Sequence, residues 1–148
     1  MDCLVAHGGL DMPSNPETLQ AIEDACVAGI KQSASATDRV VAALETFEND
    51  PLFNAGYGSV LYHVGGVETD ALIFDGRSGR IAGVGSVPKL RHPSRVAAAL
   101  LTERDFLLLC GSGARKFADK IGEPQDDLRT HEQIRAWRSH LYGANGSA

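Results

Sequence analysis

The chain has 148 residues, of which 43% are hydrophobic and 22% charged, as expected for a globular protein with one hydrophobic core. A formal charge of −5 and the lack of any Lys/Arg-rich run argue against nucleic-acid partners, and no segment approaches the about 20 apolar residues that span a bilayer. The first residues place an acid where a secretory signal carries basic ones, so the sequence predicts a cytoplasmic protein that inserts into no membrane.

The first half of the chain predicts one strand and two helices. The apolar run at residues 3–7 predicts a buried strand, and the two glycines after it predict a tight turn. Asn15 or Ser14 is expected to cap a helix with Pro16 in its first turn, and Thr37 to cap a second helix that Pro51 ends. The apolar residues expected to share one face of each helix are Leu19, Ile22, Cys26 and Ile30 in the first, and Val40, Val41, Leu44 and Phe47 in the second.

The second half predicts three strands, a helix, a strand and further helices. Strands are expected at 59–64, 69–76 and 81–87, and a buried strand at 106–110. Helices are expected from His92 and Pro93, over 111–122, and around Ile134, Trp137 and Leu141. Paired helices between blocks of strands favour a layered α+β sandwich over a regularly alternating Rossmann-type sheet.

Several common sites are not indicated. The GSGARKF stretch lacks the G-K-[ST] ending of a P-loop, and Lys116 stands where a dinucleotide fingerprint needs its third glycine, so we interpret it as a strand-to-helix turn. The three cysteines are odd in number and lack C-x-x-C spacing, which argues against zinc and a disulfide framework. Cys3 and Cys110 adjoin apolar runs and are expected to be small buried residues.

Asp70 and Asp75 lie five residues apart on one predicted strand, hence on opposite faces, and do not form an acid–base pair. Each is expected to accept hydrogen bonds from loop amides.

Two loops are unusual. The His-Gly-Gly stretch at 7–9 allows positive φ and a close approach of backbone to another group, although a plain turn also explains it. The stretch NDPLFNAGYG at 49–58 combines a proline and two glycines with apolar residues. From composition three interpretations remain open: a packed loop, a loop whose carbonyls bind a hard cation, and a loop that fixes the Asn54 amide.

The ordered motifs HGG, DPLFNAGYGSVL, ETDALIFDG, IAGVGSV, RHPSRVA and LLLCGSGARKFA resemble those of the plant-type asparaginases, also called isoaspartyl peptidases. The resemblance runs from about residue 3 to about residue 140. It is carried mainly by the family motif P-L-F-N-A-G-x-G. These enzymes are N-terminal nucleophile (Ntn) hydrolases, and this chain resembles their α-subunit.

The resemblance implies an αββα sandwich completed by a second chain, the β-subunit, cut from the same precursor. The β-subunit begins with the nucleophilic threonine, whose α-amine acts as base. None of the six threonines here lies in the T-V-G-A-V-like context of that nucleophile. Residues 1–140 would then be the α-subunit body, and 141–148 a flexible tail at the autocleavage junction. The implied assembly is (αβ)2, and the implied substrates are β-aspartyl dipeptides and L-asparagine.

The resemblance also assigns roles to both loops. Asn54 matches the family asparagine that organises the nucleophile, and His7, Gly8 and Gly9 match the glycine-rich loop that supports the active site and self-cleavage. No catalytic cofactor is implied. A structural sodium ion is implied, bound by the main-chain carbonyls at positions matching Phe47, Glu48, Asp50, Phe53, Ala55 and Tyr57.

The chain departs from the family pattern at two places. Leu10 follows HGG where the family has alanine and glycine, and RHPSRVA replaces a segment containing Asn-Pro. Two alternatives therefore remain open: a glycosylasparaginase, and a catalytically inactive binding or regulatory module of the same fold.

Overall fold

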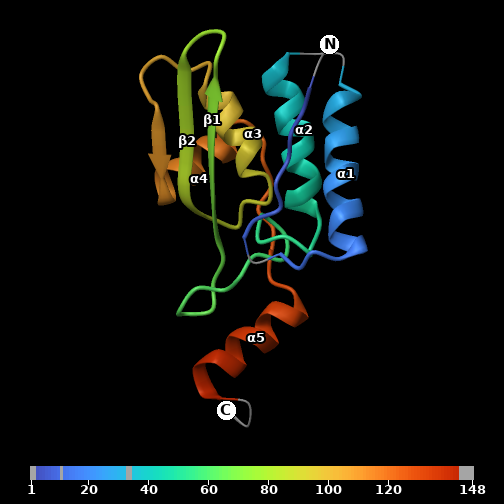
Figure 1. Cartoon of the computed structure of the whole chain (residues 1–148). Helices are drawn as coiled ribbons and strands as arrows, with labels where there is room; N and C mark the ends of the chain where they lie inside the picture. Colours follow the sequence, from blue (N-terminus) through green and yellow to red (C-terminus); the bar gives the residue numbers. More distant parts are fainter. Residues whose placement is uncertain (1–2, 11, 33–34, 144–148) are drawn as a thin grey trace.

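The computed structural model describes residues 3–10, 12–32 and 35–143 as a mixed α/β fold with a small sheet (Figure 1). In chain order the elements are α1 (Pro16–Ile30), α2 (Ala36–Asn49), β1 (Glu68–Asp75), β2 (Arg80–Pro88), α3 (Pro93–Leu100), β3 (Leu108–Cys110), α4 (Gly111–Lys120) and α5 (His131–Tyr142). None of the helices in these ranges is both long and apolar enough to cross a membrane.

The sheet has the order β1-β2-β3, and its strands form within or close to the predicted ranges 69–76, 81–87 and 106–110. β1 and β2 are antiparallel, and β2 and β3 are parallel with α3 as the crossover. The predicted role is confirmed for Asp75, which accepts the N–H groups of Arg77 and Ser78 in the hairpin turn. Asp70 instead accepts the N–H of Ser86 at 2.8 Å, and Ser86 belongs to β2 and not to a loop.

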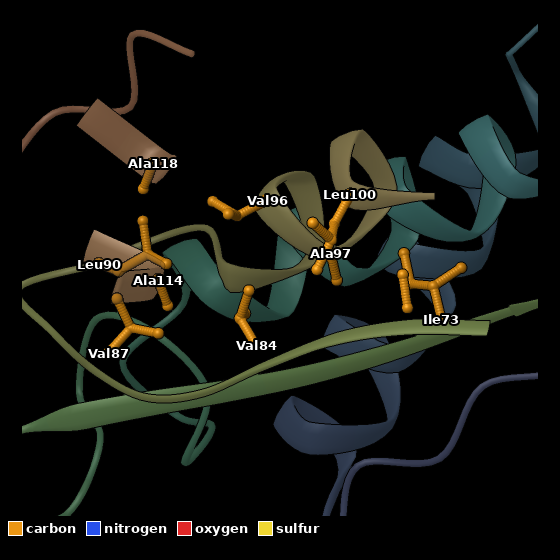
Figure 2. Packing of buried hydrophobic residues seen from close by; sticks show 10 residues of the cluster. Ile73, Val84, Val87, Leu90, Val96, Ala97, Leu100, Ala114 and Ala118 are labelled. Atoms are coloured by element: carbon orange, nitrogen blue, oxygen red, sulfur yellow. The ribbon is translucent and has the colours of Figure 1, made fainter. Parts of the chain in front are cut away.

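One face of the sheet carries the main core, covered by α3 and α4 (Figure 2). Burying each of its large aliphatic side chains stabilises the fold by about 1.5–3 kcal/mol. The members of this core are Ile73, Ala82, Val84, Val87, Leu90, Val96, Ala97, Leu100, Ala114 and Ala118. The core therefore fixes the start of α3 relative to β2.

Helices α1 and α2 pack on each other beside the sheet (Figure 1). Asn15 caps α1, one of the two predicted caps, by accepting the N–H of Thr18 at 2.9 Å. The cap of α2 is Ser35 and not Thr37, because Asp38 completes a reciprocal capping box with it.

The predicted face of α1 is only partly correct. Small residues lie against α2: a Cβ on Gly29 would come within 2.6 Å of the Arg39 carbonyl oxygen, so glycine allows close packing. Leu19 and Ile30, expected inside, are 59% and 52% exposed.

Two predicted strands do not form. Residues 3–7 are extended but pair with no described strand, with Leu4 and Ala6 half-buried between exposed neighbours. Residues 59–64 form no strand either. The predicted buried strand at 106–110 is shorter, and Leu108 is 60% exposed because no described element covers the second face of the sheet. Cys110 in β3 is exposed for the same reason. Cys3 is exposed as well, so the prediction that both cysteines are buried was wrong.

The last helix, α5, stands apart from the sheet (Figure 1). It has no buried residue, and its Trp137 ring lies against Gly65, where a Cβ would be 3.0 Å from the ring. Because α5 continues to Tyr142, the first residues of the expected flexible tail are helical, and residues 144–148 of that tail lie outside the described residues.

Candidate active site

A cavity of about 970 Å³ lies where the N-terminal segment meets the loop that follows α2. The structure brings the two unusual loops of the sequence together here, because His7, Gly8, Gly9 and Asn54 all line the cavity. Of the residues in the expected sodium set, Phe47, Glu48, Phe53 and Ala55 also line it, whereas Asp50 and Tyr57 do not.

Residues 50–59, here called loop 50–59, are held at both ends by main-chain hydrogen bonds. At its start, the N–H of Phe53 donates to the Asp50 carbonyl at 3.1 Å. At its end, the N–H of Tyr57 donates to the Glu48 carbonyl at 2.8 Å, and the N–H of Gly58 to the Leu128 carbonyl at 3.1 Å. The loop thus folds back onto the last turn of α2.

An aromatic pair anchors the loop in a second, smaller core. Phe53 is 3% exposed, and its ring centroid lies 4.4 Å from that of Phe47 on α2. Tyr57 is half-buried under the guanidinium of Arg91, which lies 5.1 Å from the ring centroid. Phe53 is therefore packed in a core, as the interpretation of a packed loop requires, whereas Leu52 is 37% exposed.

Glycine is required at two positions of the loop. Gly56 has φ +73°, and a Cβ there would lie 2.4 Å from the Glu48 carbonyl oxygen and 2.5 Å from that of Arg91. Gly58 has φ +94°, and its Cβ would lie 2.6 Å from the Pro51 Cα. Both the left-handed backbone and the close contact exclude a side chain.

Asn54 lies on the exposed rim of the loop. Its side-chain oxygen accepts the N–H of Val60 at 3.0 Å, which fixes the orientation of the amide. Its NH2 group has no hydrogen-bond partner within residues 3–10, 12–32 and 35–143 and is free to donate to a bound molecule.

The His-Gly-Gly stretch touches loop 50–59 directly. A Cβ on Gly8 would lie 3.0 Å from Phe53 Cε1 and 3.2 Å from Ile22 Cδ1, so a side chain at Gly8 would press on the aromatic anchor. The N–H of Gly9 donates to His7 Nδ1 at 3.1 Å, and the φ of +105° at Gly9 turns the chain away. This is the close approach that the glycine pair allows.

The donor chemistry of loop 50–59 fits a hard cation. The carbonyl oxygens of Phe53, Ala55 and Tyr57 accept no hydrogen bond from the described part of the chain. Main-chain carbonyls are typical ligands of hard cations, and each has two lone pairs, so the carbonyls of Phe47, Glu48 and Asp50 also keep free acceptor capacity.

The carboxyl group of Glu48 is a feature that the sequence analysis missed. The residue is 4% exposed and lines the cavity, and its carboxyl accepts two hydrogen bonds from Ser94, one from the N–H and one from the hydroxyl, both at 2.9 Å. Burial raises the pKa of Glu48 to about 7, against the opposing effect of both hydrogen bonds. The burial of Glu48 could have been predicted from helical spacing, because Glu48 follows Leu44 by four residues and adjoins Phe47 on the apolar face of α2.

Outside the cavity, charged groups join α2 to the start of α3. Arg95 binds Glu45 through two hydrogen bonds of 2.6 and 2.8 Å and approaches Glu123 at 3.6 Å. His92 Nε2 donates a hydrogen bond to the side-chain oxygen of Asn49 at 3.0 Å, and the ring lies 3.7 Å from Glu123. Burial, followed by the charge of Arg95, lowers the pKa of His92. The other charged groups facing His92 are Glu45 and Arg91. No cluster of potential metal-ligating side chains occurs among the residues that the structure describes.

Comparison with known proteins shows the family of the chain. Residues 9–147 match a family described as Asparaginase. The chain is similar to a plant-type L-asparaginase of Pyrococcus abyssi, with 35% identity over 144 residues, 93% of this chain and 47% of that protein. It is similar to an isoaspartyl peptidase/L-asparaginase of Mus musculus, with 38% identity over 129 residues, 82% of this chain and 40% of that protein. Another protein of the latter name, from Danio rerio, is 33% identical over 147 residues, 93% of this chain and 47% of that protein. The chain thus spans less than half the length of these relatives.

Proposed function

The chain belongs to the asparaginase family, and from this premise we propose that it is the α-subunit of an autoprocessed amidohydrolase. The substrates would be β-aspartyl dipeptides and the side-chain amide of L-asparagine. The observation that carries the proposal is the meeting of His7, Gly8, Gly9 and Asn54 at one cavity. The names of the relatives support the same chemistry.

The chemical step would use a threonine at the start of the partner chain. Its hydroxyl attacks the β-aspartyl carbonyl, its α-amine takes the proton, and the amine leaves after accepting a proton. Water then hydrolyses the resulting ester and releases aspartate. An oxyanion hole is worth roughly 3–4 kcal/mol per donor in such reactions, and its groups would lie on the partner chain.

The residues of this chain would position the reacting groups. The Asn54 amide, oriented by Val60, offers its NH2 at the rim of the cavity. The His7–Gly9 turn packs on Phe53 through Gly8 and also lines the cavity. A structural sodium ion bound to carbonyls of Phe47, Glu48, Asp50, Phe53, Ala55 and Tyr57 would stiffen loop 50–59 without entering the reaction.

The open face of the sheet supports the proposed second chain. Leu72 and Phe74 are each 65% exposed there, beside Ile81 and Leu108. A Cβ on Gly83 would be 3.0 Å from Leu72 Cδ1 and 3.4 Å from Leu108 Cδ1, so these leucines close over the glycine as one apolar surface. Such a surface on a sheet requires a covering layer. We assign that layer to a sheet of the β-subunit, which gives an αββα sandwich and, after dimerisation, (αβ)2.

The experiment that tests the proposal is to express the complete gene, measure the intact masses of all chains that co-purify, and sequence their N-termini. The expected result is a companion chain that begins with threonine, together with turnover of a β-aspartyl dipeptide. Cleavage of a glycosylated asparagine alone would indicate a glycosylasparaginase. Absence of any companion chain would favour a binding module. The cytoplasmic location stays a prediction from the sequence.

The partner surface is tested separately by Leu72→Lys, with Arg77→Glu in the exposed hairpin turn as the control. The lysine should reduce recovery of the companion chain because it places a charge in the covered face. Equal recovery from both variants would argue against this interface.

A further inference from the structure

We propose that the carboxyl group of Glu48 is a positioning residue that holds loop 50–59, and through it Asn54, by joining the end of α2 to the start of α3. This inference concerns the side chain of Glu48, whereas the sodium proposal uses only its carbonyl. Its kinetic part rests on the proposed function, but its structural part does not.

The side chain of Glu48 meets α3 at its first turn. Ser94 follows Pro93, the first residue of α3, and gives both its N–H and its hydroxyl to the Glu48 carboxyl. The helix lacks a side-chain cap of its own, because His92 at the N-cap makes no capping hydrogen bond. Glu48 therefore supplies, from 46 residues away, the acceptor that an N-cap residue normally provides.

The main chain of the same residue meets loop 50–59. The Glu48 carbonyl accepts the N–H of Tyr57, and Gly56 is packed between this carbonyl and that of Arg91. Arg91 directly precedes the N-cap of α3, and its guanidinium covers the Tyr57 ring. Gly56 and Tyr57 thus lie in a narrow slot. The last turn of α2 forms one side of this slot, and the segment before α3 forms the other.

The width of that slot depends on the contact between Glu48 and Ser94. That contact directly joins the last turn of α2 to the first turn of α3 at the slot. Asn54 lies two residues before Gly56, and its side chain is tied to Val60 on the other side of the slot. A shift of the slot walls would therefore displace the Asn54 amide relative to the cavity.

The chemistry of the residue also favours a positioning role. Burying a carboxyl group costs free energy that hydrogen bonds only offset, and a residue selected for packing alone would be apolar like its neighbours Leu44 and Phe47. An apolar residue at position 48 would fill the space but leave the Ser94 N–H without its acceptor.

The test compares Glu48→Gln with Glu48→Met in the assembled protein from the complete gene. Glutamine keeps both hydrogen bonds, with its oxygen accepting from the Ser94 N–H and its NH2 donating to the hydroxyl, whereas methionine has similar volume and keeps neither. Amide hydrogen exchange of residues 53–60 should accelerate about tenfold or more in Glu48→Met and stay near wild type in Glu48→Gln, because leaving the buried Ser94 N–H without an acceptor costs about that factor. Exchange within α1 should not change.

Kinetics on a β-aspartyl dipeptide give the second readout. We expect kcat to fall about tenfold or more in Glu48→Met with KM nearly unchanged, and Glu48→Gln to restore kcat. Wild-type exchange rates at 53–60 in Glu48→Met, or equal damage in both variants, would overturn the inference. If the wild-type protein does not turn the dipeptide over, the proposed function fails while hydrogen exchange still decides the role of Glu48. If Glu48→Met does not assemble, Ser94→Ala replaces it: loss of the hydroxyl bond should still accelerate exchange at 53–60, and unchanged exchange would overturn the inference.

Discussion

Replacing Gly56 by alanine should destabilise the protein more than the same change at Gly79. The two glycines have similar positive φ angles, +73° and +68°. They differ in surroundings: nothing lies within 4 Å of a Cβ on Gly79, whereas a Cβ on Gly56 would overlap two carbonyl oxygens. Gly79→Ala is therefore a matched control that carries only the conformational cost.

The expected losses in the free energy of unfolding follow from two costs, the left-handed backbone conformation and the steric overlap of the added Cβ. A left-handed alanine costs about 1–2 kcal/mol at either position. At Gly56 the contacts of 2.4 Å to the Glu48 oxygen and 2.5 Å to the Arg91 oxygen involve backbone atoms, which move only if loop 50–59 moves. Relieving such overlap typically costs about 1–3 kcal/mol more. We expect a total loss of about 2–5 kcal/mol for Gly56→Ala.

The assay is urea unfolding of the assembled protein, with the free energy of unfolding compared between the two variants at equal protein concentration. The reasoning also predicts that Gly56→Ala lowers turnover while Gly79→Ala does not. If Gly56→Ala costs no more than Gly79→Ala, the slot between α2 and the start of α3 is not rigid, and the geometry described for loop 50–59 is refuted.

Three further predictions concern the same region. Asn54→Ala should lower kcat on a β-aspartyl dipeptide about 100-fold, as misplaced catalytic groups do. It should lower the free energy of unfolding by less than about 1 kcal/mol, because only one exposed hydrogen bond is lost. Wild-type turnover would refute the proposed role of Asn54 in organising the nucleophile. Exchanging sodium chloride for choline chloride should lower the melting temperature, since an ion present at 100 times its Kd stabilises by about 2.7 kcal/mol; an unchanged melting temperature would argue against the ion. The pKa of His92 is lowered in the folded state, so its contribution to stability is present above pH 6.5 and lost as pH falls below that value. Because asparagine suits the N-cap of α3, His92→Asn should keep the helix and flatten the dependence of the urea midpoint on pH below 6.5. An equally steep dependence in the variant would refute the assignment.

Local signals in the sequence predicted much of the fold correctly. The Asn15 cap with Pro16, the stop at Pro51 and the hairpin between Asp75 and Arg80 depend on residues close in sequence, and each lies where it was expected. The misplaced cap of α2 was also a local signal, because Ser35 and Asp38 have capping-box spacing. The buried face of α1 was harder to predict, since close helix packing selected small residues over larger apolar ones.

The candidate site was predictable in part. The two loops stood out because glycines and apolar residues are rare together in a connector, and the structure places both at one cavity. The Glu48–Ser94 contact was not predictable from spacing, because its partners are 46 residues apart and their meeting depends on how α2 and α3 pack. The roles of Asn54 and of the carbonyl set stay predictions from family resemblance.

The strand predictions at residues 3–7 and 106–110 went wrong in a related way, since both segments carry apolar side chains that no described element covers. Residues 3–7 keep the alternating burial of a strand, with Val5 88% exposed, yet no described strand offers them hydrogen bonds. Leu107 and Leu108 belong to an apolar run that the sequence predicts to be buried, yet they are 58% and 60% exposed, and Leu108 lies on the open face of the sheet beside Gly83. Apolar patterning reflects every surface that a chain covers, including surfaces covered by another chain. A second sheet against β1–β3 would bury Leu108, and a free strand edge within it would give residues 3–7 the ladder that their pattern predicts. The errors of the strand prediction are therefore themselves an argument for the proposed β-subunit.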